Sequence, residues 1–152
     1  MAVLVLATDG GPPAQTATWW LASWARRGDV VHVITVRMRF SDAMFTEMVE
    51  SYVPLSDSVL EEMERSSTAA ANKVVKDACA ILSASGLACE TAVLEGRPAE
   101  EIVRYVRAHA VDLLVMGTRG HGPIVGWAIG SVSLAVLAHA PCPVLIVPPC
   151  QR

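Results

Sequence analysis

Short apolar runs recur along the chain and are separated by longer stretches in which polar and apolar positions are mixed. The runs are rich in valine, isoleucine and leucine. Short runs of this composition are typical of β-strands that are buried on both faces. The pattern therefore predicts five strands, at residues 3–7, 30–36, 87–94, 111–116 and 144–147.

The stretches between these runs carry the patterns and boundary signals of helices. Residues 12–27 begin with two prolines, which suit a first helical turn, and end before Gly28. Residues 57–84 and 98–109 are amphipathic, and the second of these has acids in its first turn, where they favour the helix dipole. Residues 131–139 form a fourth helix-like stretch. This alternating order predicts an α/β fold with a parallel, doubly wound sheet.

One segment, residues 37–56, fits neither a strand nor a long helix. It carries methionine and aromatic residues with acids between them. About 20 residues without firm structure are uncommon in a compact domain, so a short helix with an apolar face is predicted. The simplest prediction is that this face packs against its own domain. Covering a ligand mouth and joining a partner are the alternatives.

Composition favours a single domain over residues 1–152. A chain of 152 residues can bury one core of ordinary size. Hydrophobic residues make up 53%, yet no apolar run approaches the roughly 20 residues of a membrane span. The first apolar run has no basic leader, so no signal peptide is expected and a cytoplasmic location is predicted. A net charge of −3 without basic tracts argues against a nucleic-acid surface.

The four cysteines are Cys79, Cys89, Cys142 and Cys150, and they form no C-x-x-C motif and lie at no metal-ligand spacing with histidine. Cys79 falls in a helical pattern and Cys89 in a strand pattern, where cysteine behaves as a small apolar residue. Reduced core thiols are therefore predicted, with Cys150, after two prolines, as the candidate exposed thiol.

A glycine-punctuated segment, residues 117–131, lies between the fourth predicted strand and the last helix. Glycine lets backbone N–H groups approach an anion, and a helix N-terminus adds free donors and the positive end of its dipole. No Asp or Glu follows Asp112, so Arg119 and His121 have no carboxylate close in sequence, and the local charge favours an anion. The segment predicts a phosphate-binding loop. A loop that needs glycine only for tight turns is the alternative.

The glycine spacing excludes two common phosphate motifs. No Gly-Lys-Ser/Thr follows, as a Walker A loop requires, and the glycines from Gly120 onward give G-x-G-x-x-x-G instead of the dinucleotide G-x-G-x-x-G. What remains is G-x-x-G, nine residues, then Gly-Ser, at Gly117, Gly120, Gly130 and Ser131. This pattern resembles the nucleotide-binding signature of the universal stress protein family. The likeness extends to residues 3–10, 96–102, 112–117 and 140–147.

The resemblance implies a five-stranded Rossmann-like sheet of order 3-2-1-4-5, with strands 1 and 4 flanking a nucleotide crevice. The implied ligand is ATP with Mg²⁺, and Asp9 is the candidate metal ligand. The implied binding residues are Ala7, Thr8 and Asp9 for adenine and ribose, Val33 for adenine through its backbone, Met116 and Gly117 for ribose, and Thr118, Arg119, Gly120, Gly130, Ser131, Val132 and Ser133 for the phosphates. The Ser131 and Ser133 hydroxyls would serve equally as helix caps.

The chain departs from the family pattern after Asp9, where Gly11 and two prolines stand in place of the usual serine or similar residue. A different start of the first helix is therefore expected. Trp127, which the signature does not fix, is predicted to anchor the loop on the domain. The histidines outside the loop, His32, His109 and His139, are predicted to be structural.

These observations predict an ATP-binding universal stress protein that acts as a nucleotide-responsive module with at most slow hydrolysis. No serine or cysteine is visibly paired with a base, and no glutamine or glutamate in the glycine loop would orient a water. The resemblance also implies a homodimer through antiparallel pairing of the last strand, residues 143–147, which carries no protecting charge. The alternatives are a nucleotide-free interaction dimer and an ATP-pyrophosphatase-like or nucleotidyl-transfer enzyme of similar fold.

Overall fold

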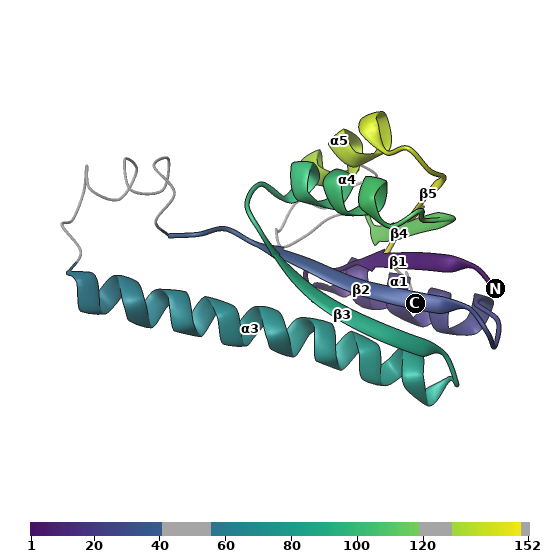
Figure 1. The fold of residues 1–152 in the computed structure, drawn as a ribbon, viewed down its shortest axis with the longest axis horizontal. Helices are drawn as coiled ribbons and strands as arrows, with labels where there is room; N and C mark the ends of the chain where they lie inside the picture. The colour runs from purple at the N-terminus through teal and green to yellow at the C-terminus, as the bar shows by residue number, and fades with distance from the viewer. Residues whose placement is uncertain (41–55, 119–128, 150–152) are drawn as a thin grey trace.

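The chain folds around a five-stranded parallel sheet of order β3-β2-β1-β4-β5, as Figure 1 shows. The computed structural model describes residues 1–40, 56–118 and 129–149. The strands are β1 (Val3–Ala7), β2 (Val30–Arg37), β3 (Ala88–Glu95), β4 (Leu113–Gly117) and β5 (Val144–Val147). The helices are α1 (Pro12–Trp24), α3 (Asp57–Ala84), α4 (Pro98–Ala108) and α5 (Ser131–His139). The predicted fold class and strand order are confirmed.

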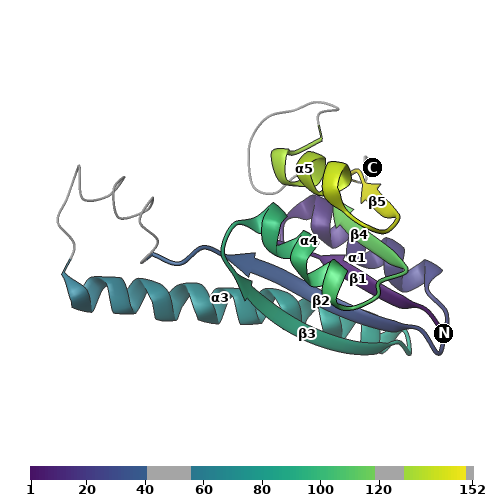
Figure 2. The same cartoon turned by 45° about the horizontal axis from the view of Figure 1, so that its top comes forward.

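Helices cover both faces of the sheet, with α1 and α3 on one face and α4 and α5 on the other (Figure 2). Successive residues of β1 point to opposite faces. Leu4 and Leu6 therefore join the core beneath α1 and α3, whereas Val5 and Ala7 join the core beneath α4 and α5. Burial on both faces explains why β1 reads as a continuous apolar run.

The first helix was predicted to reach residue 27 but ends at Trp24, so its predicted end was wrong. Ala25 is already extended, and the Asp29 carboxylate accepts the Arg26 N–H at 3.0 Å and the Ala2 N–H at 2.8 Å. Gly28 has a φ of 101°, which an L-residue rarely adopts. The turn into β2 is thus held by Asp29, and this contact competes with continuation of the helix.

The fourth strand begins at Leu113, two residues later than predicted. Ala110 has a positive φ of 47°, and Asp112 turns its carboxylate back to accept the Val3 N–H at 2.8 Å. Val111 is nevertheless buried in the core beneath α4 and α5. Its apolar character reflects packing, and the sequence pattern alone does not distinguish that from membership of the strand.

The first turns of α3 extend beyond the carboxyl ends of β2 and β3 (Figure 1). A charge cluster holds this extension, because Arg37 pairs with both Glu64 of α3 and Glu95 of β3, and Arg39 pairs with Glu95. Glu64 also accepts the Phe40 N–H at 2.7 Å. The helix predicted within residues 37–56 falls largely on residues 41–55, which lie outside the described ranges.

Within the described part of the chain, no helix is both long enough and apolar enough to span a membrane.

Candidate functional site

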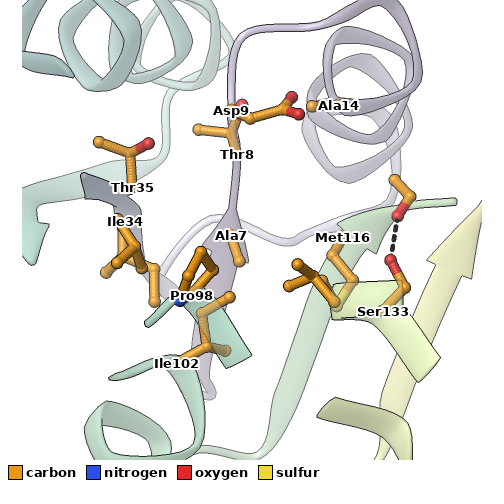
Figure 3. A pocket seen from close by; sticks show the side chains of 13 residues that line it. Ala7, Thr8, Asp9, Ala14, Ile34, Thr35, Pro98, Ile102, Met116 and Ser133 are labelled. Atoms are coloured by element: carbon orange, nitrogen blue, oxygen red, sulfur yellow. Dashed lines mark hydrogen bonds between the residues drawn. The ribbon is translucent and has the colours of Figure 1, made fainter. Parts of the chain in front are cut away.

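A cleft of about 180 Å³ opens at the carboxyl ends of β1, β2 and β4 (Figure 3). In an open parallel sheet this end, where the strand order reverses between β1 and β4, is where ligands bind. The residues that line it are Ala7, Thr8, Asp9, Ala14, Ile34, Thr35, Val36, Pro98, Ile102, Met116, Gly117, Val132 and Ser133.

One side of the cleft is apolar. Ile34 and Val36 come from the end of β2, and Pro98 and Ile102 come from the first turns of α4. Figure 3 shows Ile34, Pro98 and Ile102 gathered on the same side of the cleft, with Met116 across from them. Apolar walls with a few polar groups are typical of small-molecule sites, and a flat aromatic ring suits such a wall.

The turn after β1 supplies polar groups at the mouth of the cleft. The Thr8 N–H donates to the Ile34 carbonyl at 2.9 Å, which continues the β1–β2 pairing one residue further. The Thr8 hydroxyl accepts the Gly10 N–H at 3.1 Å, and Asp9 Oδ1 accepts the Gly11 N–H at 2.8 Å. These bonds place the exposed Asp9 carboxylate beside the start of α1, which begins at Pro12 despite the departure from the family pattern.

Gly117, at the end of β4, lies directly against the start of α1. A Cβ added there would stand 2.7 Å from the Pro13 carbonyl carbon and 2.8 Å from the Ala14 nitrogen. Backbone atoms at this distance leave no room for a side chain. The glycine is therefore required by close packing of α1 on β4, in addition to any role at a ligand.

Ser133 ties the first turn of α5 to the end of β4. Its hydroxyl donates to the Gly117 carbonyl at 2.9 Å and lies 3.4 Å from the Thr118 carbonyl, and the residue is only 3% exposed. The Thr118 N–H in turn donates to Val147 of β5 at 3.0 Å, and the Gly130 N–H donates to Thr118. These bonds fix the N-terminus of α5 relative to the cleft.

The three helices that begin around the cleft differ in their fitness for an anion. α1 begins with Pro12 and Pro13, which have no N–H to donate. α4 begins with a proline, and Glu100 and Glu101 in its first turn repel an anion. α5 begins at Ser131 after a glycine N-cap, with no acid in its first turn. Of these three N-termini, that of α5 is the one suited to a phosphate.

Seven of the predicted binding residues line the cleft: Ala7, Thr8, Asp9, Met116, Gly117, Val132 and Ser133. Thr118, Gly130 and Ser131 adjoin it at the β4 end and the α5 start. Val33 is not among the lining residues, and its side chain is buried in the core beneath α1 and α3. Its expected contact with adenine is through the backbone and stays a prediction. Arg119 and Gly120 lie outside the described residues, as do His121 and Trp127.

The sequence analysis missed the lining residues from β2, α1 and α4, which are Ala14, Ile34, Thr35, Val36, Pro98 and Ile102. The strand order places the end of β2 beside the end of β1. This order could therefore have predicted that Ile34, Thr35 and Val36 line the cleft.

The described histidines lie away from the cleft and bond within the fold. His32 Nδ1 is 3.0 Å from the Tyr105 hydroxyl, and its Nε2 is 3.8 Å from Glu90. His109 Nδ1 is 2.7 Å from the Tyr105 carbonyl oxygen, and His139 Nδ1 is 2.8 Å from the Ala135 carbonyl oxygen. The described residues contain no group of three or more His, Cys, Asp or Glu that could hold a metal ion.

The model of the universal stress protein family matches residues 1–148. The chain belongs to the universal stress protein family. A universal stress protein of Thermus aquaticus is 40% identical over 105 residues, which cover 66% of this chain and 74% of the relative. A universal stress protein of Mycobacterium tuberculosis is 31% identical over 95% of this chain, which spans 47% of that relative's length.

Solved structures of the family share the fold at low identity. The universal stress protein UspA from Lactobacillus plantarum has a TM-score of 0.78 at 23% identity, covering 96% of this chain and 97% of the other. A family protein from Arabidopsis thaliana, solved with AMP bound, has a TM-score of 0.71 at 18% identity, covering 99% and 94%. Other solved members are complexes with cAMP and with dAMP.

Proposed function

We propose that this universal stress protein binds an adenine nucleotide, ATP with Mg²⁺, in the cleft at the ends of β1, β2 and β4. The observation that carries the proposal is that the cleft has one apolar side and one side that favours negative charge. An apolar wall of Ile34, Pro98 and Ile102 lies on one side, and the acid-free N-terminus of α5 lies at the other. The complexes of family members with AMP, cAMP and dAMP support the choice of an adenine nucleotide.

The arrangement of donors suggests how the nucleotide would be oriented. Adenine would lie against the apolar wall, where burial of a flat ring is favourable. The phosphates would then point toward the start of α5, where the Ser131 and Val132 backbone N–H groups and the helix dipole favour negative charge. Gly130 would adjoin them, although its own N–H donates to Thr118. Ser133 would act mainly by holding this helix start, because its hydroxyl already donates to Gly117.

Asp9 is the carboxylate at the cleft that would hold Mg²⁺. Mg²⁺ bound to a nucleotide keeps several waters and needs only one or two protein carboxylates besides the phosphates. One Asp9 oxygen accepts the Gly11 N–H, which orients the carboxylate at the mouth of the cleft. With ATP bound, the ion would neutralise phosphate charge. We propose a nucleotide-responsive module with at most slow hydrolysis.

We further propose a homodimer through β5. This strand forms one edge of the sheet and pairs with β4 alone in the described fold. The Pro143 carbonyl accepts a bond from Leu114 of β4, and the Val147 carbonyl accepts one from Thr118, directly after β4. The backbone groups of Leu145 therefore also face β4, and those of Val144 and Ile146 face outward. An uncovered apolar edge favours pairing with a second chain. Leu134 and Leu137 on the adjacent α5, 57% and 46% exposed, would extend the contact.

Calorimetric titration of Gly130→Val with ATP and Mg²⁺ tests the nucleotide proposal. Gly130 has φ −64° and ψ 157°, a conformation that valine adopts readily, so the variant should fold normally. A valine side chain would crowd the phosphates, and ATP affinity should fall strongly. Ala80→Val, on the exposed side of α3, is the matched control. Equal affinity of parent and Gly130→Val would contradict the proposed phosphate position.

A further inference from the structure

A side chain of α1 is bonded to the turn that carries Asp9. Gln15 Nε2 donates to the Gly10 carbonyl at 3.1 Å. The first backbone hydrogen bond of the helix runs from the Gln15 N–H to the Gly11 carbonyl at 2.9 Å. The Gly10 carbonyl therefore lies one residue before the carbonyls that the helix backbone engages, and the Gln15 amide reaches back to it.

The start of α1 lacks the groups that usually close such a turn. Pro12 and Pro13 stand at its first positions and carry no N–H. The N-cap residue is Gly11, which has no side chain to cap the helix, and it stands where the family pattern has a serine or similar residue. The Gln15 side chain thus supplies a link between helix and turn that neither the N-cap nor the two prolines can make.

The turn also packs against α3. Gly10 has a φ of 77°, and a Cβ added there would stand 2.9 Å from Val74 Cγ2. The Gly10 N–H donates to the Thr8 hydroxyl at 3.1 Å. The position of Gly10 is therefore set by Val74 and Thr8, and the direction in which its carbonyl points is set by Gln15.

One peptide group connects Gln15 to Asp9. The carbonyl that Gln15 holds belongs to Gly10, and the N–H of the same peptide group belongs to Gly11 and donates to Asp9 Oδ1 at 2.8 Å. A peptide group is planar, so its C=O and N–H point in opposite directions and turn together. Glycine on both sides gives this peptide group more freedom to rotate than other residues would allow.

We propose that Gln15 is a positioning residue that orients the Asp9 carboxylate through the Gly10–Gly11 peptide group. This role rests on the proposed nucleotide site, where Asp9 would hold Mg²⁺ at the mouth of the cleft. Without the Gln15 amide the peptide group can rotate, and rotation weakens the hydrogen bond that orients Asp9. Gln15 itself is not among the residues that line the cleft, so it acts through Asp9 and not on the nucleotide.

Amide NMR of the nucleotide-free protein tests the positioning on its own. Gln15→Met keeps the length of the side chain but has no donor, so the Gly11 amide resonance should shift and its hydrogen exchange should become about two- to tenfold faster. Thr16→Val is the matched control, because it removes the Thr16 hydrogen bond to the Pro12 carbonyl within the same helical turn. It should leave the Gly11 amide unchanged. An unchanged Gly11 amide in Gln15→Met would overturn the proposal, whether or not the protein binds a nucleotide.

Calorimetric titration with ATP, once with Mg²⁺ and once with EDTA, tests the consequence for the site. Gln15→Met should reduce the gain in ATP affinity that Mg²⁺ brings by about two- to tenfold and should leave the affinity in EDTA unchanged. Thr16→Val should match the parent in both titrations. A gain in Gln15→Met equal to that of the parent would overturn the proposal. A parent protein with no gain from Mg²⁺ would instead overturn the Mg²⁺ site and this role of Gln15 together, even where the Gly11 amide responds as expected.

Discussion

Replacing Gly117 by alanine should destabilise the protein through a single steric contact. The new Cβ would stand 2.7 Å from the carbonyl carbon of Pro13, whereas ordinary contacts begin at 3.4 Å. The nearest atoms belong to the backbone of α1, so the start of that helix must move away from β4. Overpacking of this kind costs about 1–3 kcal/mol. Because Asp9 and Ala14 flank the moved turn and line the cleft, ATP affinity should fall as well.

Urea unfolding followed by tryptophan emission measures the stability loss, since α1 carries Trp19, Trp20 and Trp24. Gly28→Ala is the matched control. Its Cβ would meet no atom within 4 Å, but its φ of 101° is unfavourable for alanine and should cost about 1–2 kcal/mol. The two variants should lose comparable stability, and only Gly117→Ala should bind ATP more weakly. A Gly117→Ala protein as stable as the parent would refute the close approach of α1 to β4.

Three further changes test other parts of the structure. Asp9→Ala should weaken ATP binding by about 1.5–3 kcal/mol in calorimetry with Mg²⁺, and unchanged affinity with and without Mg²⁺ would remove Asp9 from the site. Arg37→Met should lower the free energy of unfolding at pH 7 by about 1–3 kcal/mol, because Glu64 and Glu95 lose a shared partner. The hydrogen bond from Arg37 lowers the pKa of Glu64, and hydrogen bonds from Arg39 and then Arg37 lower the pKa of Glu95. The ionised Glu64 and Glu95 therefore stabilise the fold above their ordinary pKa of 4.5. This stabilisation is lost as the pH falls through the lowered pKa values. Urea unfolding from pH 7 to pH 3 should therefore be less pH-dependent in the variant, and parallel curves would contradict this. Ile146→Pro removes an N–H that faces outward from β5, so the variant should be monomeric in light scattering. It should lose less stability than Leu145→Pro, which removes a hydrogen bond to β4. A parent protein that is monomeric at micromolar concentration would overturn the proposed dimer.

The fold was predictable because the central strands β1, β2 and β4 are largely buried on both faces and several helices start or stop at proline or glycine. Parallel strands need long crossovers, so the alternation of elements left few topologies, and the family resemblance supplied the strand order. The end of α1 and the start of β4 were predicted wrongly because they depend on side-chain contacts that a local sequence pattern does not reveal. Asp29 ends α1 early by binding the turn, and Asp112 delays β4 by bonding to Val3.

The glycine signature located the cleft but could not describe its apolar wall. Ile34 and Ile102 look like ordinary core residues in sequence, and only the meeting of β2 with α4 puts them at a surface hollow. The signature also could not show whether a glycine is needed for the ligand or for packing within the fold. Gly117 was assigned to the ribose, yet the packing of α1 already requires it.

Identification of the nucleotide held by freshly purified protein tests the central proposal most directly. The protein would be denatured, the released small molecules identified by mass spectrometry, and the emptied, refolded chain titrated with ATP and Mg²⁺. The cleft geometry predicts one adenine nucleotide bound per chain, with binding lost in Gly130→Val and retained in Ala80→Val. No released nucleotide, together with no binding of ATP, ADP or AMP at millimolar concentration, would contradict it.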